Sequence, residues 1–108
     1  MANTFKSTAN ANIETSGNTI YTCPAATQTT LIGMTIANKS SGTVIANIHL
    51  RRSGVDYVVL ANVPILSGST LVPIGGEQKL VLQASDELRA NASTNNTVDV
   101  IASLLEIA

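Results

Sequence analysis

Short segments of alternating apolar and polar residues, separated by turn signals, run along the whole chain and leave few folds open. Turn-forming clusters lie at Ser16–Asn18, Lys39–Gly42, Ser67–Ser69 and Thr94–Asn96, with others between them. Their spacing of about 8–12 residues is typical of sandwiches and barrels, and no segment supports a helix. We therefore predict an all-β fold, an antiparallel β-sandwich of about eight strands, of which the jelly roll is one form.

The alternation also predicts which side chains form the core, because successive residues of a strand point to opposite faces. The inward sets are expected to be Ile32, Met34 and Ile36; Val44, Ala46, Ile48 and Leu50; Leu80 and Leu82; Leu88, Ala90 and Ala92; and Val98, Val100, Ala102 and Leu104. Weaker patterns predict further strands at Thr19–Thr22, Val55–Leu60 and Ser69–Pro73, and a turn at Gly75–Gly76.

The length of 108 residues fits one domain. We expect residues 1–11 to form an N-terminal arm or edge strand and residues 12–108 to form a single β-sandwich domain. Met1–Asn12 contains no apolar run, so a secretory signal is not expected. No segment reaches the ~18–20 apolar residues of a membrane span, and we expect no membrane partner.

Composition points to a protein whose surface is covered by neighbours. Charged residues make up only 12% of the chain, aromatic residues 3%, and the net charge is −1. Neutral polar residues take the place of charges, with 13 Thr, 10 Ser and 10 Asn. A free monomer usually keeps its surface charged. Nucleic acid is not an expected partner, because no basic patch could neutralise a row of phosphates.

The chain offers little catalytic chemistry. Cys23 and His49 are the only cysteine and the only histidine, too few for a zinc site, and no pattern selects a nucleophile with a base. We expect Cys23 to be a small buried side chain at a strand end, and His49 to lie at the surface or in an interface. We predict no enzyme activity, no catalytic residue, no cofactor, no metal and no small-molecule substrate.

Two groups of charged residues have simple structural interpretations. Arg51 and Arg52 could meet acidic partners, but a strand-end salt bridge to Asp56 across the short Ser53–Gly54 turn is the simpler interpretation. The pair Asp86-Glu87 follows a turn, and we expect these carboxylates to be solvated at the start of a strand.

Four apolar residues near the two ends of the chain are candidates for a subunit contact. Ile101, Leu105 and Ile107 alternate with predicted core residues and leave a second apolar face on one strand, and Phe5 lies in the expected arm. Ordinary exposed hydrophobic residues are the alternative, since much of any protein surface is apolar. We favour a contact with another subunit.

Strand and turn motifs extend along nearly the whole chain. They are Tyr21-Thr22-Cys23-Pro24-Ala25, Ile36–Gly42, Arg52–Gly54, Val63–Ile65, Gly75–Asp86 and Val98–Ile107. This pattern resembles small virion structural proteins of tailed bacteriophages, particularly those of T4-like myoviruses that infect cyanobacteria. The resemblance implies a virion component on the capsid surface, in the neck or collar, or in the tail. No catalytic residue belongs to the pattern, so none is carried over.

These observations predict a non-enzymatic phage virion structural protein that assembles on the particle through subunit–subunit contacts. Capsid decoration or cement, neck or collar, and tail component are the candidate roles. The expected partners are further copies of the chain, as a homo-oligomer, and other virion proteins. The expected location is the virion, after synthesis and assembly in the host cytoplasm.

Two other classes of function are alternatives. A host-surface or carbohydrate-binding β-sandwich module would need a concave site with aromatic side chains, and only Phe5, Tyr21 and Tyr57 could supply them. An enzyme would need convergent ionisable groups, and the one local set is His49, Arg51 and Asp56.

Overall fold

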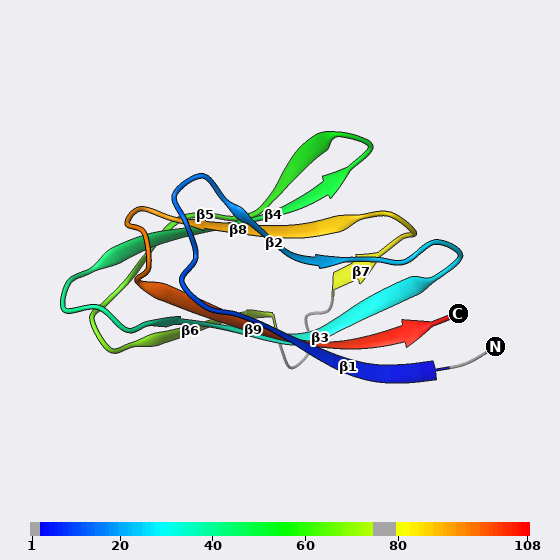
Figure 1. Ribbon diagram of the computed structural model, residues 1–108, viewed down its shortest axis with the longest axis horizontal. Coiled ribbons are helices and arrows are strands. Elements are labelled where there is room, and N and C mark those ends of the chain that lie inside the picture. Colours follow the sequence, from blue (N-terminus) through cyan, green and yellow to red (C-terminus); the bar gives the residue numbers. More distant parts are fainter. Residues whose placement is uncertain (1–2, 75–79) are drawn as a thin grey trace.

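The computed structural model describes residues 3–74 and 80–108, which form an all-β protein (Figure 1). These residues contain nine strands and no helix. The strands are β1 (Asn3–Asn10), β2 (Asn18–Thr22), β3 (Gln28–Asn38), β4 (Val44–Arg52), β5 (Val55–Ile65), β6 (Thr70–Ile74), β7 (Leu80–Leu82), β8 (Glu87–Ala92) and β9 (Val98–Ile107). The predicted turn at Gly75–Gly76 lies outside the described residues.

The strands form two antiparallel sheets that face each other. The first sheet has the order β1-β9-β3-β6, with β7 also paired to β3, and the second has the order β2-β8-β4-β5. In Figure 1 they are the lower and the upper layer, and both chain ends lie at the same end of the molecule. Because β6 and β7 pair with successive parts of β3, they occupy one strand position. The topology is that of an eight-position jelly roll, which confirms the predicted sandwich with nine strands in place of about eight.

Side chains between the two sheets form the core, and most of the predicted inward sets lie there. On β9, each of the four predicted residues is at most 1% exposed. On β4 and β8 the predicted sets are also buried, except Leu50, which is half-buried and packs against the core, as Leu80 does on β7. The core members predicted from alternation and found buried are Met34, Ile36, Val44, Ala46, Ile48, Leu82, Leu88, Ala90, Ala92, Val98, Val100, Ala102 and Leu104.

A β-bulge makes one core prediction wrong. On β3, Leu31 pairs with Leu104 of β9, but Gly33 pairs with the adjacent residue Ser103, so Ile32 is an extra residue without a partner. An extra residue reverses the inward and outward order of the strand. As a result Leu31 is fully buried, whereas Ile32, expected in the core, is only half-buried.

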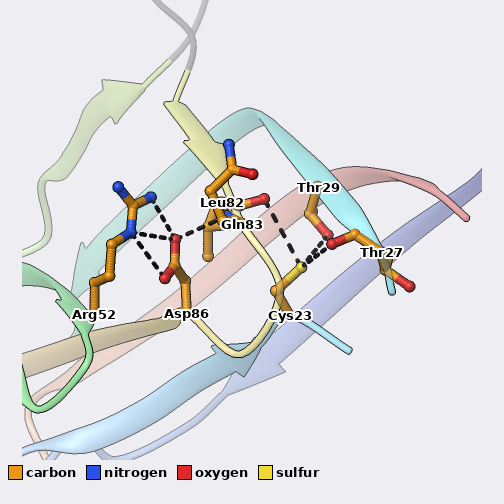
Figure 2. A network of polar contacts seen from close by, with 7 residues as sticks. All are labelled: Cys23, Thr27, Thr29, Arg52, Leu82, Gln83 and Asp86. Atoms are coloured by element: carbon orange, nitrogen blue, oxygen red, sulfur yellow. Dashed lines mark hydrogen bonds and ion pairs between the residues drawn. The ribbon is translucent and has the colours of Figure 1, made fainter. Parts of the chain in front are cut away.

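A buried carboxylate ties the β4–β5 hairpin to the turn between β7 and β8 (Figure 2). Asp86 accepts hydrogen bonds from Nε and Nη2 of Arg52, at 3.0 and 2.5 Å, and from the backbone N–H of Gln83 at 2.8 Å. Its side chain is only 2% exposed. The prediction that Asp86 is solvated is therefore wrong, because the turn folds the carboxylate back onto its own backbone and Arg52 neutralises its charge.

Candidate subunit interface

The outward face of the first sheet brings together all four residues that the sequence marked for a subunit contact. Phe5 on β1 and Leu105 on β9 are cross-strand partners. Ile101 and Ile107 lie at even spacings from Leu105 on the same strand, so they point to the same side of the sheet. Phe5 is 77% exposed and Ile101 51% exposed, while the other two are half-buried.

A row of uncharged and mostly apolar side chains crosses this face from one edge of the sheet to the other. Thr30 on β3 is the partner of Leu105, and Val81 on β7 is the partner of Thr30, so the row runs Phe5, Leu105, Thr30, Val81. Val81 is 48% exposed. Val81 was not among the predicted contact residues, because the pairing of β7 with β3 cannot be inferred from the alternation of three residues.

Where β9 is paired with both β1 and β3, the outward-facing residues of the three strands carry no charge. In cross-strand rows these positions are Asn3, Ile107 and Gln28; Phe5, Leu105 and Thr30; Ser7, Ser103 and Gly33; and Ala9, Ile101 and Thr35. We call this set, together with Val81, the uncharged face. A protein that packs on this face would therefore desolvate no charged side chain of these rows, which removes a major cost of association.

A second exposed apolar group lies on the β4–β5 hairpin, which rises away from the sandwich as the green hairpin in Figure 1. Val55, Tyr57 and Val58 are 51%, 53% and 63% exposed. The sequence offered a signal for Tyr57 and Val58, because Tyr57–Leu60 is a continuous apolar run, and an edge strand covered on one side cannot bury every residue of such a run.

The two arginines of the hairpin are engaged in structural ion pairs. Arg51 Nε lies 2.6 Å from Asp56 Oδ1, which confirms the predicted strand-end salt bridge for Arg51, whereas Arg52 pairs with Asp86. The Arg51 guanidinium holds the pKa of Asp56 below its usual value. His49, the third member of the enzyme alternative, is half-buried between its cross-strand partners Val58 and Arg89.

A pocket of about 460 Å³ lies between the hairpin tip and the β7–β8 turn. Both arginine side chains that line it, Arg51 and Arg52, are already bonded to carboxylates. Within residues 3–74 and 80–108, no group of three His, Cys, Asp or Glu side chains could hold a metal ion. No helix in the same ranges could cross a membrane.

The three aromatic side chains, all in the described part of the chain, lie in three different places. Phe5 is on the uncharged face, Tyr57 is on the hairpin, and Tyr21 is 8% exposed in the core. A sugar-binding platform needs several aromatic faces around one concavity, so this arrangement does not favour the carbohydrate-binding alternative.

A buried polar network joins the two sheets near the chain ends. Tyr21 Oη of β2 donates to Glu106 Oε2 at 2.5 Å and lies 2.9 Å from Thr29 Oγ1 of β3. Cys23, directly after β2 and 1% exposed, is buried at a strand end as predicted, and Figure 2 shows its Sγ facing Thr27 and Thr29. Burial and the bond to Glu106 raise the pKa of Tyr21 to about 12.

The Tyr21 hydroxyl should make stability fall at alkaline pH. Its pKa is raised from 10.0 to about 12 by folding, so the unfolded chain loses the proton first, and the free energy of unfolding should decrease as the pH rises through this range. Tyr21→Phe should cost about 1–2 kcal/mol at neutral pH and remove this alkaline decrease. Urea unfolding at neutral pH and in alkaline buffers measures both effects.

Tyr57→Phe on the exposed hairpin is the matched control, and it should keep the alkaline decrease. If Tyr21→Phe also keeps it, the Tyr21 hydroxyl is not the group responsible.

Comparisons with known proteins give structural similarity without sequence similarity. No protein-family model matches the chain, and no curated protein matches it. A chain of the IBDV viral particle superposes with a TM-score of 0.58 and 11% identity, over 96% of this chain and 30% of that chain. A subunit of Bacillus endospore appendages, described as disulfide-linked pili, superposes with a TM-score of 0.55 and 12% identity, over 96% of this chain and 85% of that chain.

These similarities define the class of fold. At such identities they show that the chain has a β-sandwich of the kind found in the IBDV particle chain, and the present chain spans less than a third of that longer protein. Both of these proteins belong to larger assemblies, a viral particle and pili.

Proposed function

We propose that this chain is a non-enzymatic virion structural protein that assembles with copies of itself through the uncharged face of the first sheet. The observation that carries the proposal is the row Phe5, Leu105, Thr30 and Val81, in which Thr30 is the one polar member, set among rows without a charged side chain. Exposed apolar side chains gathered on one face are typical of protein–protein contact sites.

The energetics support an interface at this face. Full burial of a Phe or Ile side chain contributes about 1.5–3 kcal/mol, and Phe5 and Ile101 still expose 77% and 51% of their surface. A symmetric contact would bury these side chains from both copies. The gain exceeds what one ion pair at the surface would supply, and it must offset the loss of rigid-body freedom on association.

Three observations support placement in a virion. The jelly-roll topology is common among viral capsid domains, the IBDV particle chain has a similar fold, and the sequence motifs resemble small virion proteins of tailed phages. On this basis the role is capsid decoration or cement, neck or collar, or tail component. The partners are copies of the chain and other virion proteins assembled in the host cytoplasm.

The similarity to a pilus subunit also supports self-assembly, but it does not extend to the chemistry of the link. The appendage pili are described as disulfide-linked. Cys23 is the only cysteine of the present chain and is 1% exposed. We therefore assign the contact to non-covalent burial.

Replacing Ile101 and Leu105 together by Asp should dissociate the assembly. Each copy would then carry two charges into an interface that has none, and desolvating an unpaired carboxylate costs several kcal/mol. Both residues point outward, so the fold should survive. Sedimentation velocity measures the mass, and far-ultraviolet circular dichroism checks the β-structure.

The matched control is the double variant Tyr57→Asp with Val58→Asp, which adds the same charge to the hairpin. It should leave the mass unchanged. If the Ile101→Asp, Leu105→Asp variant keeps the wild-type mass, the uncharged face is not the interface. If the hairpin variant dissociates instead, the interface lies on the second sheet, to which the hairpin belongs.

A further inference from the structure

Strand β1 is attached to the sandwich without an apolar anchor. Among the described residues, β1 contributes no side chain to the core, and the first core residue of the chain is Ile13, which is fully buried. The β1 residues that face inward, opposite the buried positions of β9, are Thr4, Lys6, Thr8 and Asn10. Six of the eight positions of β1 are exposed.

The contacts that hold β1 are contacts that any copy of the chain could supply. β1 pairs antiparallel with β9 along its whole length, from Asn3↔Ile107 to Asn10↔Val100. Among the described residues, the ion pair that β1 makes is Lys6 Nζ to Glu106 Oε1 at 3.2 Å, and the Lys6 side chain is half exposed. A pair of this kind contributes about 1 kcal/mol or less. If β1 moved to β9 of another copy, every one of these contacts would re-form there.

The chain has a short hinge directly after β1. Asn12 has a φ of 58°, a left-handed conformation that Asn tolerates better than most residues. Its backbone N–H donates to Asp99 Oδ1 at 3.0 Å, and its side-chain oxygen accepts from Lys39 Nζ at 2.6 Å. The sandwich therefore holds the chain from Asn12 onward, and the eight residues of β1 lie beyond that point. Short hinges with unusual backbone geometry favour exchange of the element that they connect.

We propose that β1 is exchanged between copies, so that β1 of one subunit completes the first sheet of its neighbour by pairing with β9. The partner is a second copy of this chain, because only a copy offers the same eight-residue register and the same carboxylate for Lys6. The inference rests on the proposed function, since exchange needs an assembly. The exchange of β1 would place Phe5 on the uncharged face of the neighbouring copy. The two copies would then be linked at the same face that is proposed above as the subunit contact.

A disulfide placed between β1 and β9 distinguishes exchange from pairing within one chain. Ser7 and Ser103 are outward-facing cross-strand partners, and directly opposed residues in antiparallel strands lie about 4.5–5.5 Å apart at Cα, within the range of a disulfide. In the double variant Ser7→Cys, Ser103→Cys, exchange should give chains covalently linked to one another on a non-reducing gel. Pairing within the chain should instead give a monomer band with an internal disulfide.

Controls separate this result from random oxidation and from failure of the proposed function. Ser7 and Ser103 both lie on the uncharged face, so the single variants report any cross-linking across that contact, and exchange predicts linked product in the double variant well above theirs. The pair Ser7→Cys with Thr94→Cys, whose second position is exposed in the β8–β9 loop, should give no more linked product than the single variants. A protein that is oligomeric by light scattering but internally cross-linked overturns exchange and leaves the proposed function intact. A protein that is monomeric in solution overturns the proposed function, and exchange with it.

Discussion

Leu31→Ala should lower the free energy of unfolding by about 2–5 kcal/mol, whereas Ile32→Ala should lower it by about 1 kcal/mol or less. The two residues are adjacent and similar in size, but the bulge at Ile32 places Leu31 in the core with no exposed surface. Truncation of Leu31 therefore leaves a cavity between the sheets, while Ile32 is only half-buried. Chemical denaturation of both variants measures the difference.

This comparison tests the register of β3 against β9. An uninterrupted alternation would place Ile32 with Met34 and Ile36 on the inward side, and it predicts the opposite order of the two effects. Equal losses for both variants, or a larger loss for Ile32→Ala, would contradict the bulge. Met34→Ala, which is inward in either register, should be strongly destabilising and serves as the positive control.

Asp86→Ala should destabilise the protein by about 2–3 kcal/mol, and lower the melting temperature by roughly 10–20 °C. The carboxylate accepts from both Arg52 and the backbone N–H of Gln83. Without it, Arg52 can still reach water because its side chain is 43% exposed, but the N–H of Gln83 loses its acceptor and the hairpin loses its attachment. Asp86→Asn should cost less, because an amide oxygen can still accept from Gln83.

Arg52→Ala should have an effect that depends on pH. The Arg52 guanidinium, with help from the Gln83 N–H, holds the pKa of Asp86 below its usual value. A lowered pKa stabilises the fold above the usual pKa of about 4, and this contribution is lost as the pH falls through the lowered value. The difference in stability between wild type and Arg52→Ala should therefore be largest at neutral pH and shrink in acid. A difference that is constant with pH would show that the pair contributes through packing only.

The sequence predicted the fold where the alternation is regular. On β8, and on β9 from Val98 to Leu104, every second residue is apolar and faces the opposite sheet, so the predicted inward sets are correct to the residue. On β3 the four consecutive residues Leu31, Ile32, Gly33 and Met34 permit either phase. The choice between phases depends on the pairing with β9, which is a contact between segments far apart in the sequence.

Only part of the candidate interface could be predicted from the sequence, because the rest depends on contacts between strands that are far apart in the chain. Ile101, Leu105 and Ile107 follow from the alternation of one strand, but their meeting with Phe5 and Val81 depends on the strand order. Asp86 was placed wrongly because a turn sequence does not reveal that Arg52, far away in the chain, covers the carboxylate. Tertiary partners of this kind are not encoded in local patterns.

The molar mass in solution shows whether copies of this chain assemble through the uncharged face. We would measure the mass of the purified full chain by light scattering behind a sizing column, over a series of protein concentrations. Assembly through the uncharged face predicts a discrete oligomer with closed symmetry: a dimer where this face meets the same face of one other copy, or a ring such as a trimer, pentamer or hexamer where exchange of β1 joins the copies in a cycle. A clean monomer at every concentration would contradict it.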